Sequence, residues 1–245
     1  MRGWIGGALL LTCALVPLSH ADCSAQSVAM HPHLVELYTS EGCSSCPPAD
    51  AWLRDLPGNA GVVALAFHVD YWDSLGWRDR FADARYSDRQ RQQARRDLTE
   101  SVYMPQVVLD GRSWQGWYRG TGLPAAQDSQ LAMKMTVVLA TSSLQLHLDS
   151  TVPDGIYAGA YRNFVVLTED GLSSEVHAGE NRGVTLRHDH VVRNMAGPLP
   201  ASSADVRINI PADADVSKST LVVFAQDPGR GDIAQVLSLP LSQCR

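Results

Sequence analysis

The sequence has few of the features that mark nucleic-acid-binding or membrane-spanning proteins. Its 20 Lys and Arg residues are outnumbered by 26 Asp and Glu residues, so the formal net charge is -6 at pH 7. Binding to nucleic acid or to anionic lipid needs a basic surface, which argues against both as general partners. No segment reaches the roughly 20 apolar residues that a helix needs to cross a bilayer. The sequence therefore predicts no nucleic-acid partner and no membrane span in the mature chain.

Several catalytic signatures are missing as well. The chain has no Gly-x-Ser-x-Gly turn, no glycine-rich phosphate loop and no paired histidines of the metalloprotease kind. The composition is nevertheless that of a folded protein, because 45% of the 245 residues are hydrophobic and 19% are charged. This length allows one large domain or two modest ones.

The start of the chain indicates export. Arg2 precedes an apolar run over residues 4–16, which is too short to span a bilayer. Ser19 and Ala21 then place small residues at the two positions that a signal peptidase inspects. We expect residues 1–21 to be a signal peptide and the mature protein to be periplasmic or secreted. An uncleaved anchor is the alternative.

Export leaves four cysteines in the mature chain. An even number suggests disulfides in an oxidising compartment, and four cysteines permit three connectivities. Cys43 and Cys46 are separated by two residues and belong together, which leaves Cys23 and Cys244, near the two ends, for each other. We expect a structural Cys23–Cys244 disulfide, with two free or intermolecular thiols as the alternative.

The Cys-Ser-Ser-Cys segment at 43–46 carries the main candidate chemistry. It follows an alternating strand pattern at 34–40 and precedes a helical pattern at 49–56. Unpaired N–H groups and the positive end of the dipole at a helix start stabilise a thiolate. We therefore expect Cys43 to be the more exposed, attacking cysteine and Cys46 to be the resolving thiol of a thiol–disulfide oxidoreductase.

Two further residue pairs are placed near these cysteines by element order. A continuous apolar run at 62–69 predicts a buried strand, and His68 and Asp70 lie at its carboxyl end, where α/β sheets bind ligands. These side chains are expected either to assist proton transfer or to fix the loop. Met104 and Pro105 precede the next strand. In a thioredoxin-type core this proline has a cis peptide bond and faces the cysteines, so the pair is predicted to bind substrate.

The remaining patterns of the first half predict two helices and a hairpin. Ser87 and Gln90 form a capping box for a helix start, and seven arginines in 78–96 interleave with aspartates, which favours a solvated surface. Apolar runs on both sides of Asp-Gly at 110–111 predict a β-hairpin. Apolar residues at helical spacing predict a further helix at 123–135.

Short strands dominate the pattern that follows. They are expected at 137–148, 157–168, 174–178, 184–193, 205–210, 220–226 and 232–239. Turn residues separate them, which is typical of a β-sandwich. The sequence thus predicts an α/β plus all-β protein, with a thioredoxin-like domain at 28–136 followed by a β-sandwich-like domain at 137–245.

Five segments carry motifs that one protein family shares. They are Tyr38-Thr-Ser-Glu-Gly-Cys-Ser-Ser-Cys-Pro-Pro-Ala-Asp50, His68-Val-Asp-Tyr-Trp-Asp73, Tyr103-Met-Pro-Gln106, Gly179-Glu-Asn-Arg-Gly183 and His188-Asp-His-Val-Val-Arg193. With them the chain resembles the secreted bacterial thioredoxin-like proteins grouped as domain-of-unknown-function family 1223. The resemblance implies a thioredoxin-like fold and a redox pair at the two clustered cysteines, and it supplies no substrate.

Two other functions stay open at this point. Cys43 and Cys46 could form a purely structural disulfide in a non-enzymatic binding protein. They could also bind copper or zinc, with His68 or the His188 and His190 pair completing the ligands. The chain lacks a second Cys-x-x-Cys, which argues against a metal site. Our leading hypothesis is a redox protein that needs no cofactor or metal and acts on a protein or small thiol partner.

Overall fold

The computed structural model describes residues 21–56, 61–99, 101–129, 131–152 and 158–244. The predicted signal peptide lies outside the described residues apart from its last residue, Ala21, which begins the first strand. None of the helices in these ranges is long and apolar enough to cross a membrane.

The described part of the chain is mostly β, as the sequence predicts for its second half. The strands are β1 (Ala21–Gln26), β2 (Met30–His31), β3 (His33–Thr39), β4 (Val62–His68), β5 (Gln106–Leu109), β6 (Arg112–Ser113), β7 (Gln127–Asp128), β8 (Ala132–Ala140), β9 (Ser143–Thr151), β10 (Arg162–Glu169), β11 (Leu172–Glu175), β12 (Thr185–His188), β13 (Val191–Pro200), β14 (Ala204–Asn209), β15 (Ser219–Gln226) and β16 (Ile233–Pro240). The helices are α1 (Pro47–Arg54), α2 (Ala84–Arg96) and α3 (Gly116–Arg119), with short 3-10 segments η1 (Asp73–Leu75), η2 (Ala158–Ala160), η3 (Val216–Lys218) and η4 (Leu241–Gln243).

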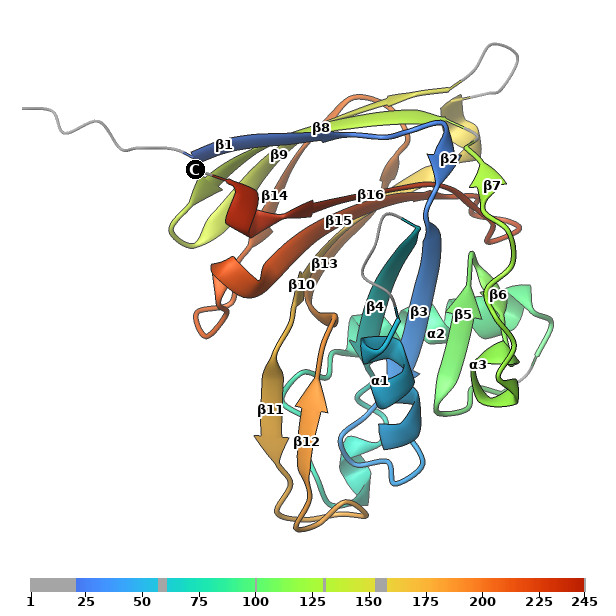
Figure 1. Ribbon diagram of the computed structural model, residues 1–245, viewed down its shortest axis with the longest axis vertical. Coiled ribbons are helices and arrows are strands. Elements are labelled where there is room, and N and C mark those ends of the chain that lie inside the picture. Colours follow the sequence, from blue (N-terminus) through green and yellow to red (C-terminus); the bar gives the residue numbers. More distant parts are fainter. Residues whose placement is uncertain (1–20, 57–60, 100, 130, 153–157, 245) are drawn as a thin grey trace, which may run out of the picture.

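A mixed sheet runs through both halves of the chain. Among the described residues it has eight strands in the order β16-β15-β10-β13-β4-β3-β5-β6 (Figure 1). β13 joins β4 in parallel, and the N–H of Ala66 donates to the carbonyl of His190 at 2.8 Å. The predicted boundary between residues 136 and 137 therefore separates strands that share one sheet. The division into two domains at that point stays a prediction.

The sheet is covered differently along its length. On one face, α1 and α3 pack against β3, β4 and β5, while the four-stranded sheet β1-β8-β9-β14 packs against β10, β15 and β16. Tyr86 of α2 packs on the opposite face. Successive residues of β3 point to these two faces, Val35 and Leu37 toward α1 and Tyr38 toward α2. Every residue of β3 is buried, as expected for a strand covered on both sides.

The expected helix at 123–135 is wrong. Residues 127–128 and 132–140 form β7 and β8, and in β8 buried and exposed residues alternate from Ala132 to Val137. Apolar residues four apart satisfy a strand as well as a helix, since four is a multiple of the strand period of two. Met133 and Met135, two apart, both reach the core between the sheets. The predicted strand at 137–148 is likewise two strands, β8 and β9, which pair as a hairpin.

The second helix starts earlier than predicted. Asp83 is its N-cap and accepts a hydrogen bond from the N–H of Arg85 at 2.8 Å, so the capping box at Ser87 and Gln90 is wrong. Six of the seven arginines in the predicted solvated surface are exposed or partly exposed, and Arg89 is the exception. Arg89 is buried and makes a bidentate ion pair with Glu36, at 2.6 and 2.9 Å.

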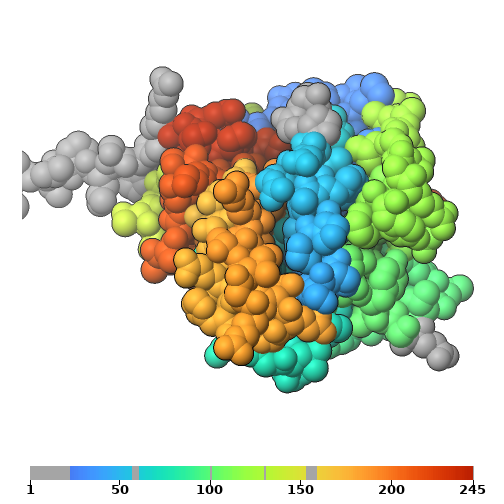
Figure 2. All heavy atoms as spheres, turned by 60° about the horizontal axis from the view of Figure 1, so that its bottom comes forward, coloured from blue at the N-terminus to red at the C-terminus, as the bar shows by residue number. Residues whose placement is uncertain are grey.

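A hairpin leaves the large sheet between β10 and β13. Its strands, β11 and β12, pair antiparallel, and the hairpin extends beside α1 (Figure 1). In Figure 2 the hairpin (orange) lies directly against the segment that carries Cys43 and Cys46 (blue). Residues 176–184, which connect the two strands, are called the covering loop below.

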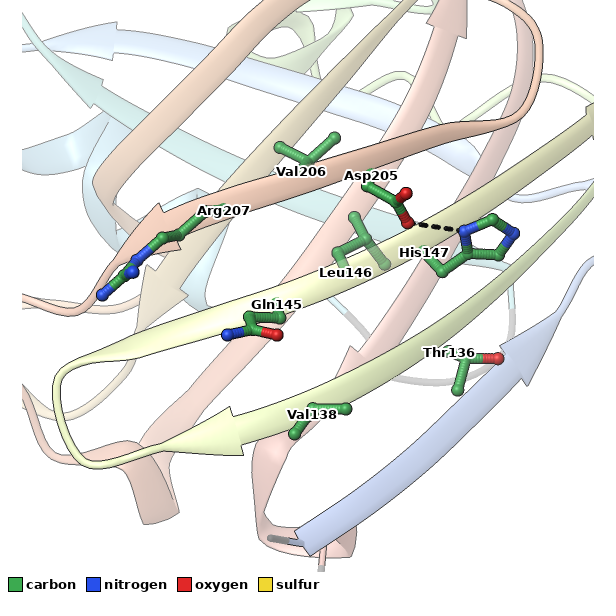
Figure 3. A pocket seen from close by; sticks show the side chains of 8 residues that line it. All are labelled: Thr136, Val138, Gln145, Leu146, His147, Asp205, Val206 and Arg207. Atoms are coloured by element: carbon green, nitrogen blue, oxygen red, sulfur yellow. Dashed lines mark hydrogen bonds and ion pairs between the residues drawn. The ribbon is translucent and has the colours of Figure 1, made fainter.

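The two ends of the described chain meet at the four-stranded sheet. Cys23 of β1 and Cys244 after η4 are joined by a disulfide. The outer face of this sheet has a shallow groove of about 380 Å³ (Figure 3). Its polar wall includes His147, whose Nδ1 lies 2.7 Å from the carboxylate of Asp205. The groove lies on a different sheet from β3, the strand that leads to Cys43 and Cys46.

Candidate functional site

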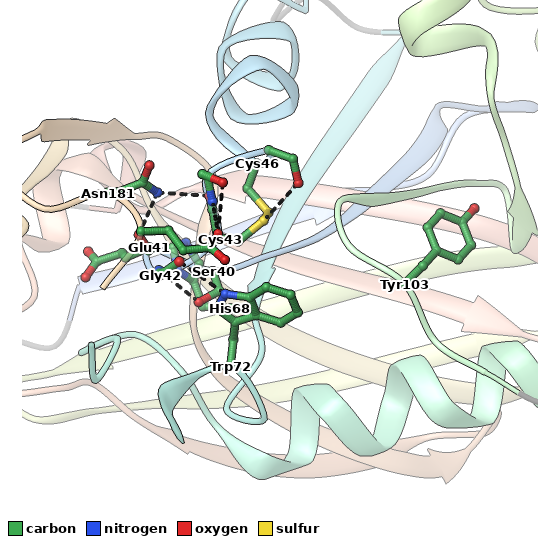
Figure 4. The surroundings of a disulfide bond; sticks show 12 residues. Ser40, Glu41, Gly42, Cys43, Cys46, His68, Trp72, Tyr103 and Asn181 are labelled. Carbon is green, nitrogen blue, oxygen red and sulfur yellow. Dashed lines mark hydrogen bonds between the residues drawn. A yellow bond between two sulfur atoms is a disulfide. The ribbon is translucent and has the colours of Figure 1, made fainter. Parts of the chain in front are cut away.

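Cys43 and Cys46 form a disulfide in the turn between β3 and α1 (Figure 4). Cys46 is the N-cap of α1, and its carbonyl accepts hydrogen bonds from the N–H groups of Ala49 and Asp50 at 2.8 and 3.1 Å. A proline in the first helical turn is acceptable because its missing N–H would have no intrahelical partner. The local sequence therefore places the cysteine pair at the positive end of a helix.

Both cysteines are buried, although the sequence predicts Cys43 to be the more exposed of the two. The exposed fraction is 1% for Cys43 and 0% for Cys46. Only the two serines between them are exposed. A nucleophilic cysteine has to be reached by its partner. What covers the pair consequently determines its chemistry.

The covering loop closes over the cysteine turn through two side chains. The amide of Asn181 donates hydrogen bonds to the carbonyls of Glu41 and Cys43, both at 2.9 Å. The carboxylate of Glu180 accepts hydrogen bonds from the N–H and the hydroxyl of Ser44, both at 2.9 Å. These bonds from Ser44 lower the pKa of Glu180. The loop thus binds the turn through main-chain groups on both sides of Cys43.

Glu41, His68, Asp79 and His188 form what we call the buried polar cluster. The Nδ1 atom of His68 lies 2.6 Å from Asp79 Oδ2, which also accepts a hydrogen bond from the N–H of Glu41 at 2.9 Å. The ring centroids of His68 and His188 are 5.1 Å apart, and His188 Nε2 lies 3.3 Å from Glu41 Oε1. Each of the four is at most 4% exposed.

Opposing charges set the protonation of this cluster. Burial disfavours the charged form of His68, but the attraction of Asp79 and its hydrogen bond outweigh burial and raise the pKa of His68. Burial likewise opposes ionisation of Asp79, and His68 overcomes it and lowers the pKa. For Glu41, burial is outweighed mainly by the neighbouring His188 ring, whose Nε2 lies 3.3 Å from Oε1, and the pKa is lowered. The cluster therefore holds two carboxylates against two histidines.

Asp50 approaches the same cluster from α1. Burial raises its pKa, although the charges of His68 and His188 oppose that effect. Its N–H belongs to the first turn of α1, bonded to the carbonyl of Cys46. An ionisable carboxyl of α1 is thus close enough to His68 and His188 for their charges to act on it.

The structure separates the two residues that the sequence paired after β4. His68 belongs to the buried polar cluster and is among the residues that surround the disulfide (Figure 4). Asp70 is directed to Ser87 of α2 instead. Its carboxylate accepts a hydrogen bond from the Ser87 hydroxyl at 2.5 Å, and its N–H donates a hydrogen bond to the Ser87 hydroxyl oxygen at 3.1 Å. Asp70 therefore fixes the loop between β4 and α2.

Met104 and Pro105 lie at the same end of the sheet as the disulfide. Their peptide bond is cis. β5 begins one residue later and pairs antiparallel with β3, with Gln106 opposite Tyr38 near the end of β3 that leads to the cysteines. Tyr103 is also among the residues around the disulfide (Figure 4), and its side chain is 48% exposed. This cis-proline segment therefore lies at the end of the sheet that leads to the cysteine turn.

Sequence reasoning missed most of the surroundings of the disulfide. Glu41, Asp50, Asp79 and Asn181 were not candidates, and His188 was considered only as a metal ligand. The motifs at 179–183 and 188–193 were visible signals, but nothing in their spacing indicated that they reach the cysteines. Burial and contact between distant segments decide this, and neither follows from local pattern.

The described part of the chain contains no ligand set for the alternative copper or zinc site. No group of three or more His, Cys, Asp or Glu side chains is placed there to hold a metal ion. His190 lies 3.2 Å from Asp170 and does not join the buried polar cluster.

These features define a class of β-rich protein in which a Cys-x-x-Cys disulfide at a strand–helix turn is covered by a hairpin from the second half of the chain. The chain belongs to the family described as "Protein of unknown function (DUF1223)", whose model matches residues 34–226. The match includes both cysteines of the turn and the covering loop. No curated protein matches the chain.

Two solved structures share the fold. One is the crystal structure of protein AGR_C_4864 from Agrobacterium tumefaciens, with 24% identity and a TM-score of 0.59 over 89% of this chain and 98% of that one. The other is HBP35 of Porphyromonas gingivalis, with 10% identity and a TM-score of 0.62 over 89% of this chain and 77% of that one. At these identities the likeness concerns the fold alone.

Proposed function

We propose that this protein is an exported thiol–disulfide oxidoreductase. In this proposal residues 28–136 form a thioredoxin-like unit, Cys43 is the attacking cysteine and Cys46 is the resolving cysteine. The observation that supports it most directly is a Cys-x-x-Cys disulfide at the N-terminus of α1, beside a strand that begins after the cis Met104–Pro105 bond. Parallel β3 and β4, with helices on both faces, are compatible with such a unit.

The exchange needs only the two sulfur atoms and a thiol partner. A partner thiolate attacks the sulfur of Cys43, the bond to Cys46 breaks, and Cys46 leaves as a thiolate. A second partner thiolate then attacks the partner sulfur of this mixed disulfide, which forms the partner's disulfide and releases Cys43 as a thiolate. The helix N-terminus stabilises negative charge on sulfur during both steps. Protein dithiols and small thiols are the partner classes, bound along Met104 and Pro105.

Burial of the cysteines adds one requirement to this proposal. Because Cys43 is 1% exposed, a partner reaches it only after the covering loop has moved away. The bonds from Asn181 and to Glu180 are the contacts that have to break. Exchange is thus expected to depend on loop opening.

A second candidate is a binding protein in which the Cys43–Cys46 bond is only structural. The same burial favours it, since structural disulfides resist reduction when reductants cannot reach them. The two disulfides present in the described residues support an oxidising compartment under either candidate.

Cysteine variants distinguish the two candidates in an exchange assay with a model protein disulfide or a small thiol. The oxidoreductase proposal predicts that Cys43→Ser abolishes exchange and that Cys46→Ser accumulates a mixed disulfide at Cys43. The double variant Cys23→Ser/Cys244→Ser is the matched control and retains exchange. Full activity in folded Cys43→Ser would exclude the assigned roles.

A further inference from the structure

The buried polar cluster contains polar atoms that the fold leaves without hydrogen-bond partners. Within the described residues these are His68 Nε2, both ring nitrogens of His188, Glu41 Oε1 and the hydroxyl of neighbouring Thr39. Glu41 Oε1 and His188 Nε2 are 3.3 Å apart but are not aligned as a hydrogen bond. Buried polar groups are almost always paired, because an unpaired one costs free energy. A set of them around two histidines therefore needs an explanation.

Charged groups face the histidines from every element packed around them. Glu41 comes from the cysteine turn, Asp50 from α1 and Asp79 from the segment between η1 and α2. His68 ends β4 and His188 ends β12. The pKa values of Glu41 and Asp79 are lowered, whereas that of Asp50 is raised. Ionised Glu41 and Asp79 balance two imidazolium charges, whereas a single proton on the histidine pair leaves one of these two negative charges in excess. The cluster thus has the charge needed to hold a second proton.

The cluster also borders the sulfur atoms. His68 is among the residues that surround the disulfide (Figure 4), and Thr39, its neighbour across β3 and β4, lies four positions before Cys43. Cys43, Cys46, His68 and His188 are all buried, so a negative charge on a sulfur after the disulfide opens would act on the histidines within the protein interior. Charge interactions in such surroundings are strong.

We propose that the His68–His188 pair takes up one proton when the Cys43–Cys46 disulfide is reduced. This inference rests on the proposed function and specifies how the redox site is linked to pH. It also assigns a role to the second half of the chain, since His188 lies on the hairpin that carries the covering loop.

The step balances in electrons and protons. A partner dithiol is oxidised to its disulfide and releases two electrons and two protons. The Cys43–Cys46 bond breaks and accepts the two electrons, and one proton gives a thiol while the other sulfur stays a thiolate. The second proton binds the histidine pair as an imidazolium. Reoxidation returns that proton to solvent as the sulfur–sulfur bond forms again.

The test is an NMR titration of the histidine rings in the folded protein, oxidised and then reduced with dithiothreitol. We expect the apparent pKa of the His68–His188 pair to rise by about one unit or more on reduction, as found for groups that gain an opposite charge nearby. His147, which pairs with Asp205 on the other sheet, is the internal control and should not shift. In His188→Gln, His68 alone should titrate and bind no additional proton. An unchanged titration of the pair on reduction would overturn the inference while leaving the oxidoreductase proposal intact.

A second comparison keeps the test decisive if dithiothreitol fails to reduce the disulfide. That failure, in wild type and in Asn181→Ala alike, would refute the oxidoreductase proposal. Cys46→Ala then supplies a lone Cys43 sulfur without any reduction, and Cys43→Ala/Cys46→Ala lacks it. A higher apparent pKa of the histidine pair in Cys46→Ala supports the coupling of sulfur charge to the cluster, and equal values in the two variants contradict it.

Discussion

The side-chain amide of Asn181 donates a hydrogen bond to the backbone carbonyl of Cys43 at 2.9 Å. The two residues come from different halves of the chain, and the bond places the covering loop directly over the cysteine turn. A main-chain contact of this kind holds the turn without depending on the redox state of the sulfur atoms. We therefore expect access to the disulfide to depend on the covering loop.

Weakening this contact should expose the disulfide. Asn181→Ala removes two hydrogen bonds, to Glu41 and Cys43, and each is worth about 1 kcal/mol. If opening precedes reaction, reduction of the disulfide should become roughly tenfold faster or more. The rate is measured by stopping the reduction with an alkylating agent at set times and determining the masses of the alkylated products by mass spectrometry.

The matched control for this experiment is Asn194→Ala. Asn194 also donates to a backbone carbonyl, that of Asn209 at 2.9 Å, but it lies outside the cysteine site. Its loss should leave the reduction rate unchanged. Equal rates for wild type and Asn181→Ala would show that the covering loop does not limit access.

The ion pair of His68 and Asp79 should contribute strongly to stability. Asp79→Asn removes a buried carboxylate. This carboxylate pairs with His68 and accepts hydrogen bonds from the N–H groups of Glu41 and Phe81. Breaking a buried pair leaves the other charge uncompensated, so we expect a loss of roughly 3 kcal/mol in the free energy of unfolding. Denaturant titration measures it. Asp88→Asn, which removes an exposed charge paired with Arg91, should cost less than about 1 kcal/mol.

The pKa shifts of His68 and Asp79 predict how the stability loss in Asp79→Asn depends on pH. The pKa of His68 is raised, so its contribution is complete below the usual histidine pKa and disappears as pH rises through the raised value. The pKa of Asp79 is lowered, so its contribution is complete above the usual aspartate pKa and disappears as pH falls through the lowered value. The stability difference between wild type and Asp79→Asn should be largest between about pH 4 and 6.5. A difference that is constant from acid to alkaline pH would contradict the assigned pair.

Arg89 provides a test of the core beneath α2. Its guanidinium pairs with Glu36 and lies over the rings of Phe164 and Phe224, at 4.8 and 4.9 Å from their centroids. Arg89→Ala leaves Glu36 charged and buried, and we expect a loss of roughly 3–5 kcal/mol. Arg91→Ala on the same helix removes only an exposed pair and should change stability by about 1 kcal/mol or less. Similar losses in the two variants would argue against the buried pair.

The disulfide between Cys23 and Cys244 should stabilise the whole chain. It closes a loop with a sequence separation of 221 residues, which restricts the unfolded state strongly. Cys23→Ser/Cys244→Ser is expected to lose roughly 2–5 kcal/mol in the free energy of unfolding while Cys43–Cys46 stays oxidised. Unfolding curves measure this loss, and mass spectrometry verifies that Cys43–Cys46 stays oxidised. An unchanged unfolding midpoint would contradict a stabilising role.

Local pattern was sufficient to predict the segment around the cysteines. Alternation in β3, the continuous apolar run of β4 and the prolines after Cys46 each match one type of element. The helix expected at 123–135 failed because Leu131 and Met135, four apart, fit both periods. Only contact with the facing sheet decides between a helix and a strand in this segment.

Contacts between distant segments were beyond prediction from the sequence. Buried Arg89 pairs with Glu36, and the carbonyl of Cys43 accepts a hydrogen bond from Asn181. A single sequence carries no local signal that such residues meet. His188 shows the same limit, because its alternation along a strand indicated a shared face but not which other residues that face contacts.

The redox equilibrium of Cys43–Cys46 tests the proposed function most directly. The folded protein is incubated in glutathione or dithiothreitol buffers of graded potential, alkylated and analysed by mass, with Cys23–Cys244 as the internal comparison. We predict that Cys43–Cys46 is reduced reversibly with a midpoint between about -270 and -120 mV, the range of known oxidoreductases, while Cys23–Cys244 stays oxidised. A Cys43–Cys46 bond that stays oxidised throughout, in wild type and in Asn181→Ala alike, would contradict a redox function and identify the bond as structural.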